Sequence, residues 1–429
     1  MVSTSVVVPV FQQAWSLRLT LRSLAEQSVP TTEFQLVISD DGSTDHPLRT
    51  VDEFAGVFPN RILAGDGIHR GRAATRNRGI LAAEGSHILM IDGDSFADPQ
   101  LVARHAEHHR SLPNTALIGR RIEADWASLK ALAEGRCMGV THPHEEDPRH
   151  WHGIGAVTSS GGRTPWLFAY THNLSIPRQD LLAVGGFDES LANWGFEDNE
   201  LAYRVFRLHG RRDGYFHYEP NAVVYHLPHF RDRDRMWKEA FANGRTIRNK
   251  HPHFDMELLG TPPWEVTTAV SYYDQCLDAL RAAWTREMAV QLSSAVGVGD
   301  SSEAWIGLHL EHLRKLGVTT MDHGIEATST NFHLLGITMP FEENRFSRLV
   351  VLDVWRMLRP ADLSSLVLEG LRIAGEVVLV ASSGIAALIP EGVGFVEDLD
   401  YVAGMLSVEC SAVITRSPNC GMVRCLPPS

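Results

Sequence analysis

Short apolar runs alternate along this chain with longer segments whose apolar residues recur at helical spacing. Three runs bounded by turn residues are predicted to be buried strands: residues 5–11, 34–39 and 87–91. Residues 17–27, between the first two runs, carry leucines on one helical face, and residues 71–84 form a second helical segment. The alternation of strand and helix predicts an α/β fold with a Rossmann-like sheet.

The third strand runs directly into two aspartates, Asp92 and Asp94, which are separated by Gly93. Open α/β sheets bind their ligands at the carboxyl ends of the strands. Two carboxylates there can hold a divalent cation, and the glycine would let a diphosphate approach the backbone closely. The alternative interpretation is an ordinary Asp-Gly turn after a strand.

Two other polar segments accompany these strands. Residues 40–45 form an acidic turn after the second strand, which could accept a hydrogen bond from a nucleobase or ribose, or serve as a helix N-cap region. A phosphate-binding G-x-G-x-x-G motif is absent from this region. Four arginines follow in the next segment: Arg70, Arg72, Arg76 and Arg78. They could face a diphosphate, in which case Arg76 is the candidate for nucleotide-sugar binding, or they could form a solvated face.

Composition narrows the class of protein. A chain of 429 residues is long enough for two or three domains, and 44% hydrophobic with 21% charged residues is a soluble, globular profile. The net charge of -13 argues against nucleic acid as a partner. The five scattered cysteines are expected to be free thiols. Because the sequence shows neither a membrane-spanning stretch nor a signal-peptide n-region, we expect a cytoplasmic protein.

Four motifs occur in the order and spacing of the family-two glycosyltransferases of GT-A type: residues 8–11, 40–45, 74–79 and 92–94. The chain resembles this family over roughly its first 230 residues. The resemblance implies a UDP-sugar donor bound across the strand ends and a divalent metal, Mn²⁺ or Mg²⁺, at the Asp-x-Asp pair. It implies that Asp41 contacts the uracil and that Pro9 and Phe11 line the base pocket. Asp92 would contact the ribose or sugar, and Asp94 would bind the metal.

A second acidic motif lies in residues 193–204, where Trp-Gly-Phe-Glu-Asp opens a predicted helix. Acidic residues in a first turn complement the helix dipole. The segment also resembles the W-G-x-E-D acceptor segment of galactosyltransferase-like and chondroitin-synthase-like enzymes. That resemblance implies that Asp198 is the general base of an inverting transfer and that Glu197 beside it completes the catalytic pair. It also implies that Trp194 stacks on the acceptor. Phe196 stands where the family often has glycine, which affects acceptor identity more than the reaction.

Residues 221–226 form another apolar strand, which ends in His226. A lone histidine at a strand end is usually structural. In the galactosyltransferase-like pattern, however, a histidine at this point completes the metal site. We therefore predict His226 as a metal ligand together with Asp94, and we hold His229 in reserve. A mixed set of carboxylate and imidazole ligands suits Mn²⁺ somewhat better than Mg²⁺.

The sequence predicts three parts: a GT-A domain over residues 1–250, a helical linker over 251–299 and a small α/β accessory domain over 300–429. An amphipathic helix over 272–296 would pack on the catalytic domain or form a homodimer contact. Strands over 348–354 and 376–381 look faintly like the C-terminal half of a Rossmann methyltransferase. The glycine-rich cofactor loop is missing, so we do not predict methyl transfer. We expect a loose tail over 418–429.

These observations predict a metal-dependent, inverting glycosyltransferase that moves a sugar from a UDP-sugar to a hydroxyl or thiol acceptor. The acceptor would be a glycan, a peptide or a small natural product. Two alternatives are a nucleotidyltransferase and a non-catalytic sugar-binding scaffold. The first would carry a glycine-rich basic signature near residue 10, and the second would lose the acidic helix start at residues 197–200. The sequence has neither property.

Overall fold

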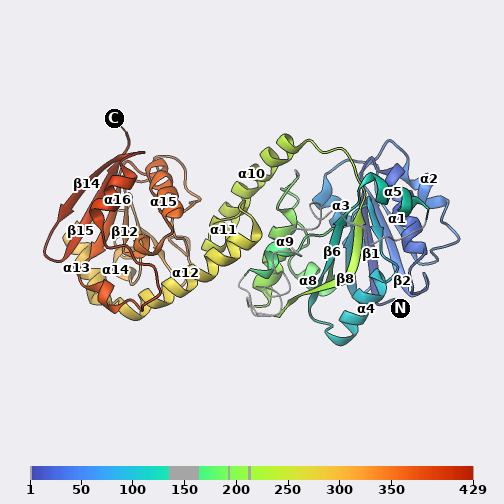
Figure 1. The fold of residues 1–429 in the computed structure, drawn as a ribbon, viewed down its shortest axis with the longest axis horizontal. Coiled ribbons are helices and arrows are strands. Elements are labelled where there is room, and N and C mark those ends of the chain that lie inside the picture. Colours follow the sequence, from blue (N-terminus) through green and yellow to red (C-terminus); the bar gives the residue numbers. More distant parts are fainter. Residues whose placement is uncertain (1, 135–163, 192–193, 211–213, 429) are drawn as a thin grey trace. The chain divides into compact units, whose positions relative to one another are not determined.

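The computed structural model describes residues 2–134, 164–191, 194–210 and 214–428 (Figure 1). The chain forms two compact units, residues 1–244 and 245–429, each with its own sheet. The helices predicted as a linker over residues 251–299 fall within the second unit.

The first unit holds an eight-stranded sheet in the order β3-β2-β1-β4-β7-β6-β8-β5 among the described residues. Its strands are β1 Thr4–Val10, β2 Phe34–Asp40, β3 Arg61–Ala64, β4 His87–Ile91, β5 Ser95–Ala97, β6 Ala116–Glu123, β7 Asn173–Pro177 and β8 Phe216–His226. Strand β7 runs antiparallel to β4 and β6, and β5 runs antiparallel to β8. The predicted α/β fold with a Rossmann-like start is confirmed.

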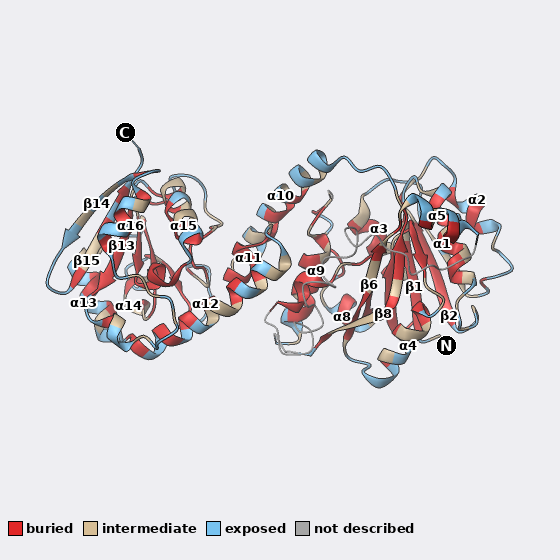
Figure 2. Ribbon diagram, viewed as in Figure 1, coloured by how far each residue is buried: buried red, intermediate tan, exposed pale blue. Residues whose placement is uncertain are grey.

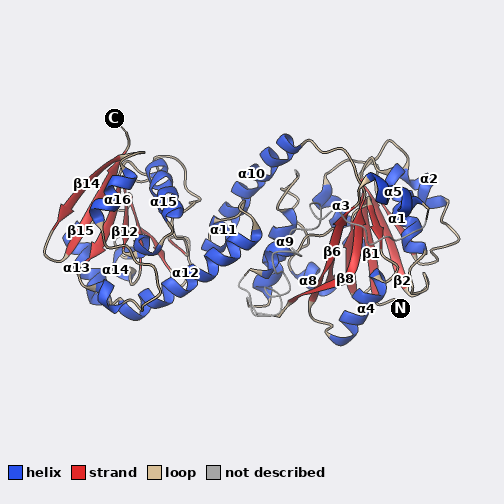
Figure 3. Ribbon diagram, in the orientation of Figure 1, coloured by secondary structure: helices blue, strands red, loops and turns tan. Residues whose placement is uncertain are grey.

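Helices lie on both sides of this sheet (Figure 3). They are α1 Ala14–Ala25, α2 Pro47–Asp52, α3 Arg72–Ala82, α4 Leu101–Ser111, α5 Trp126–Ala133, the 3-10 helix η1 Pro165–Phe168, α8 Arg178–Ala183, α9 Glu197–Leu208 and α10 Arg233–Lys250. Helix α10 crosses the boundary between the two units at residue 244.

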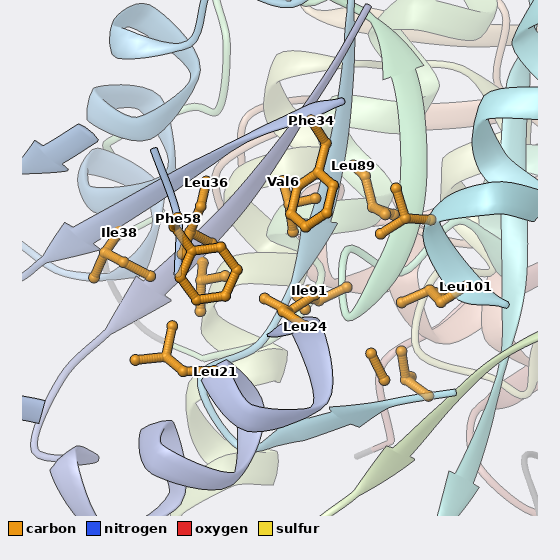
Figure 4. Close-up of a cluster of buried hydrophobic side chains, with 14 of the residues drawn as sticks. Val6, Leu21, Leu24, Phe34, Leu36, Ile38, Phe58, Leu89, Ile91 and Leu101 are labelled. Carbon is orange, nitrogen blue, oxygen red and sulfur yellow. The ribbon is translucent and has the colours of Figure 1, made fainter. Parts of the chain in front are cut away.

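Side chains that alternate along β1 build the core on both faces of the sheet. Val6 and its strand neighbours pack with Leu21 and Leu24 of α1 in one buried cluster (Figure 4). Helix α3 approaches β1 closely at Gly79, where an added Cβ would lie 2.5 Å from Cγ1 of Val7. Glycine is therefore needed for this helix to pack against the sheet.

The strand order reverses between β1 and β4, because β1 pairs with β2 on one side and with β4 on the other. Ligands of open α/β sheets bind beyond the carboxyl ends of the strands at such a switch point. The loops after β1 and β4 meet here: a Cβ on Gly93 would lie 3.1 Å from the Pro9 carbonyl oxygen and 3.0 Å from Oε1 of Gln13. A side chain between the two aspartates would therefore crowd the end of β1 and the loop that follows it.

The second unit holds a seven-stranded sheet in the order β11-β10-β9-β12-β13-β15-β14 among the described residues. Its strands, largely buried except for β14 and part of β15 (Figure 2), are β9 Glu303–Gly307, β10 Thr319–Asp322, β11 Asn331–Phe332, β12 Arg348–Leu352, β13 Val377–Ser382, β14 Ser411–Arg416 and β15 Cys420–Leu426. Its helices are α11 Phe254–Glu257, α12 Pro263–Ala283, α13 Arg286–Val296, α14 Glu311–Arg314, η2 Val354–Met357, α15 Pro360–Ile373, η3 Ile385–Leu388 and α16 Leu399–Leu406.

Two local predictions for this unit are wrong. The single amphipathic helix over residues 272–296 is instead two helices, because the chain leaves α12 at Trp284 and Thr285 caps the start of α13 by accepting a hydrogen bond from the Met288 amide. The tail is not loose, because β15 pairs antiparallel with both β13 and β14. The four described cysteines are free and buried, as expected. None of the described helices combines the length and hydropathy needed to cross a bilayer.

A group of histidines on α4 gives the first unit a pH-dependent stability. His105 and His109 both hydrogen-bond Oγ of Ser175, at 2.7 and 2.6 Å, and His109 stacks on His87 with ring centroids 4.0 Å apart. Burial lowers the pKa of His105 to about 3 and the pKa of His109 to about 2. Each ring is therefore protonated at a higher pH in the unfolded chain than in the folded protein.

We expect the free energy of unfolding of the first unit to be highest above the ordinary histidine pKa of about 6.5 and to decrease as the pH falls from there. Each such histidine contributes a slope of about 1.4 kcal/mol per pH unit. The variant His105→Gln keeps hydrogen-bonding groups but cannot titrate, so its slope between about pH 6 and pH 4 should be smaller by that amount in urea unfolding. Exposed His46→Asn serves as the control, and an unchanged slope in His105→Gln would contradict the prediction.

Candidate active site

Three side chains that can bind a metal converge at the ends of β4 and β8: Asp94, His226 and His229. One ligand atom from each lies within 4.8 Å of the others. Nδ1 of His229 is 3.0 Å from Oδ2 of Asp94, and Nε2 of His226 is 3.7 Å from Oδ1. The sheet explains this convergence, because Ser95 of β5 pairs directly with His226 of β8. His229, held in reserve on sequence grounds, lies in the same cluster as the other two.

The donor set and its burial fit a divalent cation. Oδ1 of Asp94 is buried, and among the described residues it has no hydrogen-bond partner. Its Oδ2 accepts a hydrogen bond from Nε2 of Gln13 at 2.9 Å. Burial opposes ionisation here, but the hydrogen bond from His229 and the nearby His226 ring hold the pKa of Asp94 below its ordinary value. A buried carboxylate oxygen without a partner, next to two imidazoles, suits Mn²⁺.

A carboxylate from the neighbouring strand stands behind this cluster. Oε2 of Glu123, the last residue of β6, lies 2.9 Å from Nδ1 of His226. Arg121 pairs with the other oxygen of Glu123, and Nη2 of Arg231 lies 3.6 Å from Oε2. The sequence did not point to Glu123, because its position depends on the pairing of β6 with β8, two strands about 100 residues apart.

The residues predicted for the base pocket lie together at the ends of β1 and β2. Asp41 is buried and accepts hydrogen bonds from the amides of Arg70 and Gly71, at 2.8 and 3.0 Å. Nδ1 of His69 lies 2.8 Å from Oδ2 of Asp41, and its ring stacks on Phe11 with centroids 4.2 Å apart. His69, which the sequence reasoning missed, thus makes the two contacts predicted for a uracil. A base bound on Phe11 has to share this space with His69.

The guanidinium of Arg76 is buried among three carboxylates. Its Nη2 lies 3.2 Å from Oδ1 of Asp92, and its Nη1 lies 3.2 Å from Oε1 of Glu197 and 3.6 Å from Oδ1 of Asp198. Burial alone would lower the pKa of Arg76, but the three carboxylates raise it above its ordinary value. Arg76 therefore joins the acidic turn after β4 to the first turn of α9.

The other arginines of the predicted cluster divide between two environments. Arg72 lies 3.6 Å from Oε1 of Glu197, at the edge of the Arg76 site. Arg70 and Arg78 pair with Asp66 instead. The solvated interpretation therefore fits Arg70, whereas Arg78 is largely covered and also donates a hydrogen bond to the Asp40 carbonyl oxygen. The interpretation as site residues fits Arg76 and Arg72.

A tight turn before α9 positions the acidic pair. Gly195 has a φ of 104°, and a Cβ there would lie 2.7 Å from Cβ of Ala240 in α10. Phe196 follows with a φ of 65°, in the left-handed region that a bulky residue rarely adopts. Oε2 of Glu197 accepts a hydrogen bond from the Gly195 amide at 2.9 Å. Both oxygens of Glu197 are thus engaged within the protein, one by Arg76 and one by this turn.

Asp198, the predicted general base, does not lie in the environment of an ordinary exposed aspartate. Its side chain is 18% exposed, and it accepts hydrogen bonds from Oγ1 of Thr171 at 2.6 Å and from the Thr171 amide at 3.1 Å. Burial raises the pKa of Asp198 to about 6, against the opposing charge of Arg76 and with a smaller contribution from Glu197. A carboxylate with this pKa can both accept and release a proton near neutral pH.

Trp194, the predicted acceptor residue, is held by α10. Its amide donates a hydrogen bond to Oε2 of Glu239 at 3.1 Å, and its ring lies edge-on to that of Trp237 with centroids 6.5 Å apart. Nδ2 of Asn243 also donates to the Gly195 carbonyl at 2.9 Å. Residues 192 and 193, which precede this turn, lie outside the described residues.

Family comparisons bear on the same segments. Residues 5–147 match the model of glycosyl transferase family 2, and residues 161–229 match that of the N-terminal domain of galactosyltransferase. Validoxylamine A glucosyltransferase from Streptomyces hygroscopicus subsp. jinggangensis is 27% identical over 423 residues, covering 87% of this chain and 96% of that protein. Chondroitin synthase from Escherichia coli is 27% identical over 239 residues, covering 52% of this chain and 34% of that protein.

Among solved structures, TarS 1–349 from S. aureus in complex with UDP-GlcNAc gives a TM-score of 0.43 at 16% sequence identity, covering 62% of this chain and 69% of that one. The family matches and the named relatives favour sugar transfer over the two alternative functions. With the α/β sheet and its acidic switch point, they lead to one conclusion: the protein is a glycosyltransferase that takes its sugar from a nucleotide sugar donor.

Proposed function

We propose that the protein is a metal-dependent, inverting glycosyltransferase that moves a sugar from a UDP-sugar to a hydroxyl group of a small natural product. The observation that carries this proposal is the meeting of two groups at one sheet edge. The cluster of Asp94, His226 and His229 lies on one side of the turn after β4, and Asp198 reaches the other side through Arg76 and Asp92. A cation site and a general base thus flank a single turn.

The donor would lie across the ends of β1, β2 and β4. The uracil would take the place of His69 and contact the buried carboxylate of Asp41 and the ring of Phe11 beside Pro9. Asp92 would contact the ribose or sugar hydroxyls. Asp94, His226 and His229 would hold Mn²⁺ or Mg²⁺. When bound, the metal acts as a Lewis acid that neutralises the charge of the departing diphosphate.

The acceptor hydroxyl would lose its proton to Asp198. Its oxygen forms a bond to the anomeric carbon while the bond from that carbon to the diphosphate oxygen breaks, and the electron pair leaves with UDP. Because one carboxylate is poised as base and no covalent sugar intermediate is needed, the anomeric configuration inverts. Thr171 fixes the Asp198 carboxylate through two hydrogen bonds, and Glu197 is placed to hold Arg76 and the turn at Gly195.

The choice of a natural-product acceptor rests on a relative that spans most of this chain. Validoxylamine A glucosyltransferase aligns with 87% of this chain, including much of the second unit, whereas chondroitin synthase aligns with 52%. We therefore propose glucose as the transferred sugar and a hydroxylated ring compound such as validoxylamine A as the acceptor. Trp194 offers that acceptor a flat apolar face.

We expect Asp198→Asn to bind UDP as the wild type does but to lower turnover at least about 100-fold, the scale of a lost general base. Turnover is measured by mass spectrometry with a panel of UDP-sugars and validoxylamine A, and NMR of the product reports the anomeric configuration. Asp52→Asn, an exposed aspartate on α2, serves as the control and should keep wild-type turnover. Normal turnover in Asp198→Asn would disprove the base, and a retained configuration would disprove inversion.

The raised pKa of Asp198 predicts the pH profile. Because the base must be deprotonated, kcat/KM should rise with pH through about 6 and level off above it. The variant Thr171→Val removes a hydrogen bond that favours the ionised carboxylate, so the acidic limb should move to higher pH. A limb that stays near pH 4 in the wild type would show that burial does not set the ionisation of the base.

We expect Asp94→Ala to abolish the metal dependence of UDP binding. In calorimetry, the wild type should bind UDP more tightly with Mn²⁺ than without it, because the cation links the diphosphate to the protein. The variant should bind UDP with the same weak affinity under both conditions. Equal UDP affinity of the wild type with and without Mn²⁺ would reject the metal site.

A further inference from the structure

We infer that Glu123 is a positioning residue for the metal site: it fixes the orientation and tautomer of His226 so that Nε2 faces Asp94 and the cation. This inference rests on the proposed function, since it assumes that Asp94 and His226 bind a divalent cation. Ligating histidines commonly donate their second ring N–H to a carboxylate, and that partner tunes metal affinity.

The sheet itself places the two side chains together. Glu123 and His226 are the last residues of β6 and β8, which run parallel, and they are direct register partners. The Ala124 amide donates a hydrogen bond to the His226 carbonyl at 2.9 Å, so the pairing continues past the end of β6. Backbone hydrogen bonds on both strands therefore hold carboxylate and imidazole in fixed positions.

The hydrogen bond selects one tautomer. Oε2 of Glu123 lies 2.9 Å from Nδ1 of His226, and a carboxylate accepts hydrogen bonds but does not donate them. Nδ1 must then carry the proton, which leaves the lone pair of the neutral ring on Nε2. Nε2 is the nitrogen that faces Asp94, at 3.7 Å from Oδ1, the buried oxygen without a partner among the described residues. The lone pair and this oxygen point to one shared position for a cation.

Arg231 does not replace Glu123 in this role. Its Nη2 lies 3.1 Å from Nδ1 and 3.3 Å from Nε2 of His226. The in-plane lone-pair directions of these two nitrogens diverge, so one donor atom cannot align with both. Arg231 and Arg121 instead both pair with Glu123, and they hold its carboxylate in place behind the imidazole.

The two imidazoles of the cluster also differ in their support. The side chain of His226 is 5% exposed and has the Glu123 carboxylate behind it, whereas that of His229 is 28% exposed and meets Arg231 at Nε2. The structure therefore makes His226 the rigid ligand. Loss of Glu123 should release its ring rotation and its tautomer, and metal affinity should fall by the 10- to 100-fold that is typical of such partners.

The test measures Mn²⁺ binding without donor, by calorimetry and by electron paramagnetic resonance, on the full chain. Glu123→Ala should bind Mn²⁺ about 10- to 100-fold more weakly than the wild type. Glu123→Gln keeps an oxygen that accepts from Nδ1, so it should recover part of the affinity. Glu219→Ala is the matched control, because Glu219 lies on β8 opposite Gly119 of β6, away from His226 and His229. This variant should bind Mn²⁺ with the affinity of the wild type.

Mn²⁺ affinity of a folded Glu123→Ala variant within about twofold of the wild type would overturn the inference, as would an equal loss in Glu219→Ala. Should Glu123→Ala not fold, Glu123→Gln decides together with ¹⁵N NMR of the histidine rings. Nδ1–H with a metal-bound Nε2 on His226 supports the inference, and the opposite tautomer overturns it. A wild type that binds no divalent cation would remove the metal site and this inference together, while the role of Asp198 would still be judged by its own variant.

Discussion

The ion pairs of the buried Arg76 are the constraint on which the arrangement of this site depends. A guanidinium removed from water is tolerated only when carboxylates and hydrogen bonds compensate for the lost hydration. Here the compensation comes from two distant parts of the chain, Asp92 after β4 and the pair Glu197 and Asp198 at the start of α9. Losing any of these carboxylates would leave the buried guanidinium less compensated for its lost hydration. The acidic turn and the helix are thereby held in one place.

The same cluster explains the unusual state of Asp198. Burial is the largest cost of ionising this carboxyl group, and the neighbouring Glu197 carboxylate adds to that cost. Arg76 and the two hydrogen bonds from Thr171 keep this cost moderate. The result is a pKa near 6, between that of an ordinary aspartate and that of a carboxylic acid kept neutral by burial.

The sequence was sufficient to predict the features of the site that depend on a single strand or a single helix. The apolar run before Asp92 and the acidic start of α9 identify the two halves of the site, and strand ends at a switch point bring them together. The role of Glu123 and the burial of Asp198 depend on contacts between distant residues, which a periodic pattern does not encode. The strand β15 was missed for a similar reason: only part of Cys420–Leu426 is buried, and its pairing with β13 identifies it as a strand.

The second unit shows how a similar sheet can present very different chemistry at its strand ends. Taken in chain order, its strands lie as 3-2-1-4-5-7-6, with the first five parallel, which extends the Rossmann order. The carboxylate of Asp322, at the end of β10, accepts hydrogen bonds from the amides of Leu310 and Gly324 at 2.8 and 2.7 Å. Asp353, after β12, is likewise engaged by Arg356 and Ser382.

These internal contacts bear on what the two strand-end regions can bind. In the first unit, Oδ1 of Asp94 is buried without a hydrogen-bond partner among the described residues. A ligand can therefore supply the contact that this oxygen lacks. In the second unit, the carboxylates of Asp322 and Asp353 are occupied by the protein's own donors. A ligand that binds Asp322 or Asp353 would first have to break the hydrogen bonds of these buried carboxylates. A cation at Asp94 would break no hydrogen bond of Oδ1.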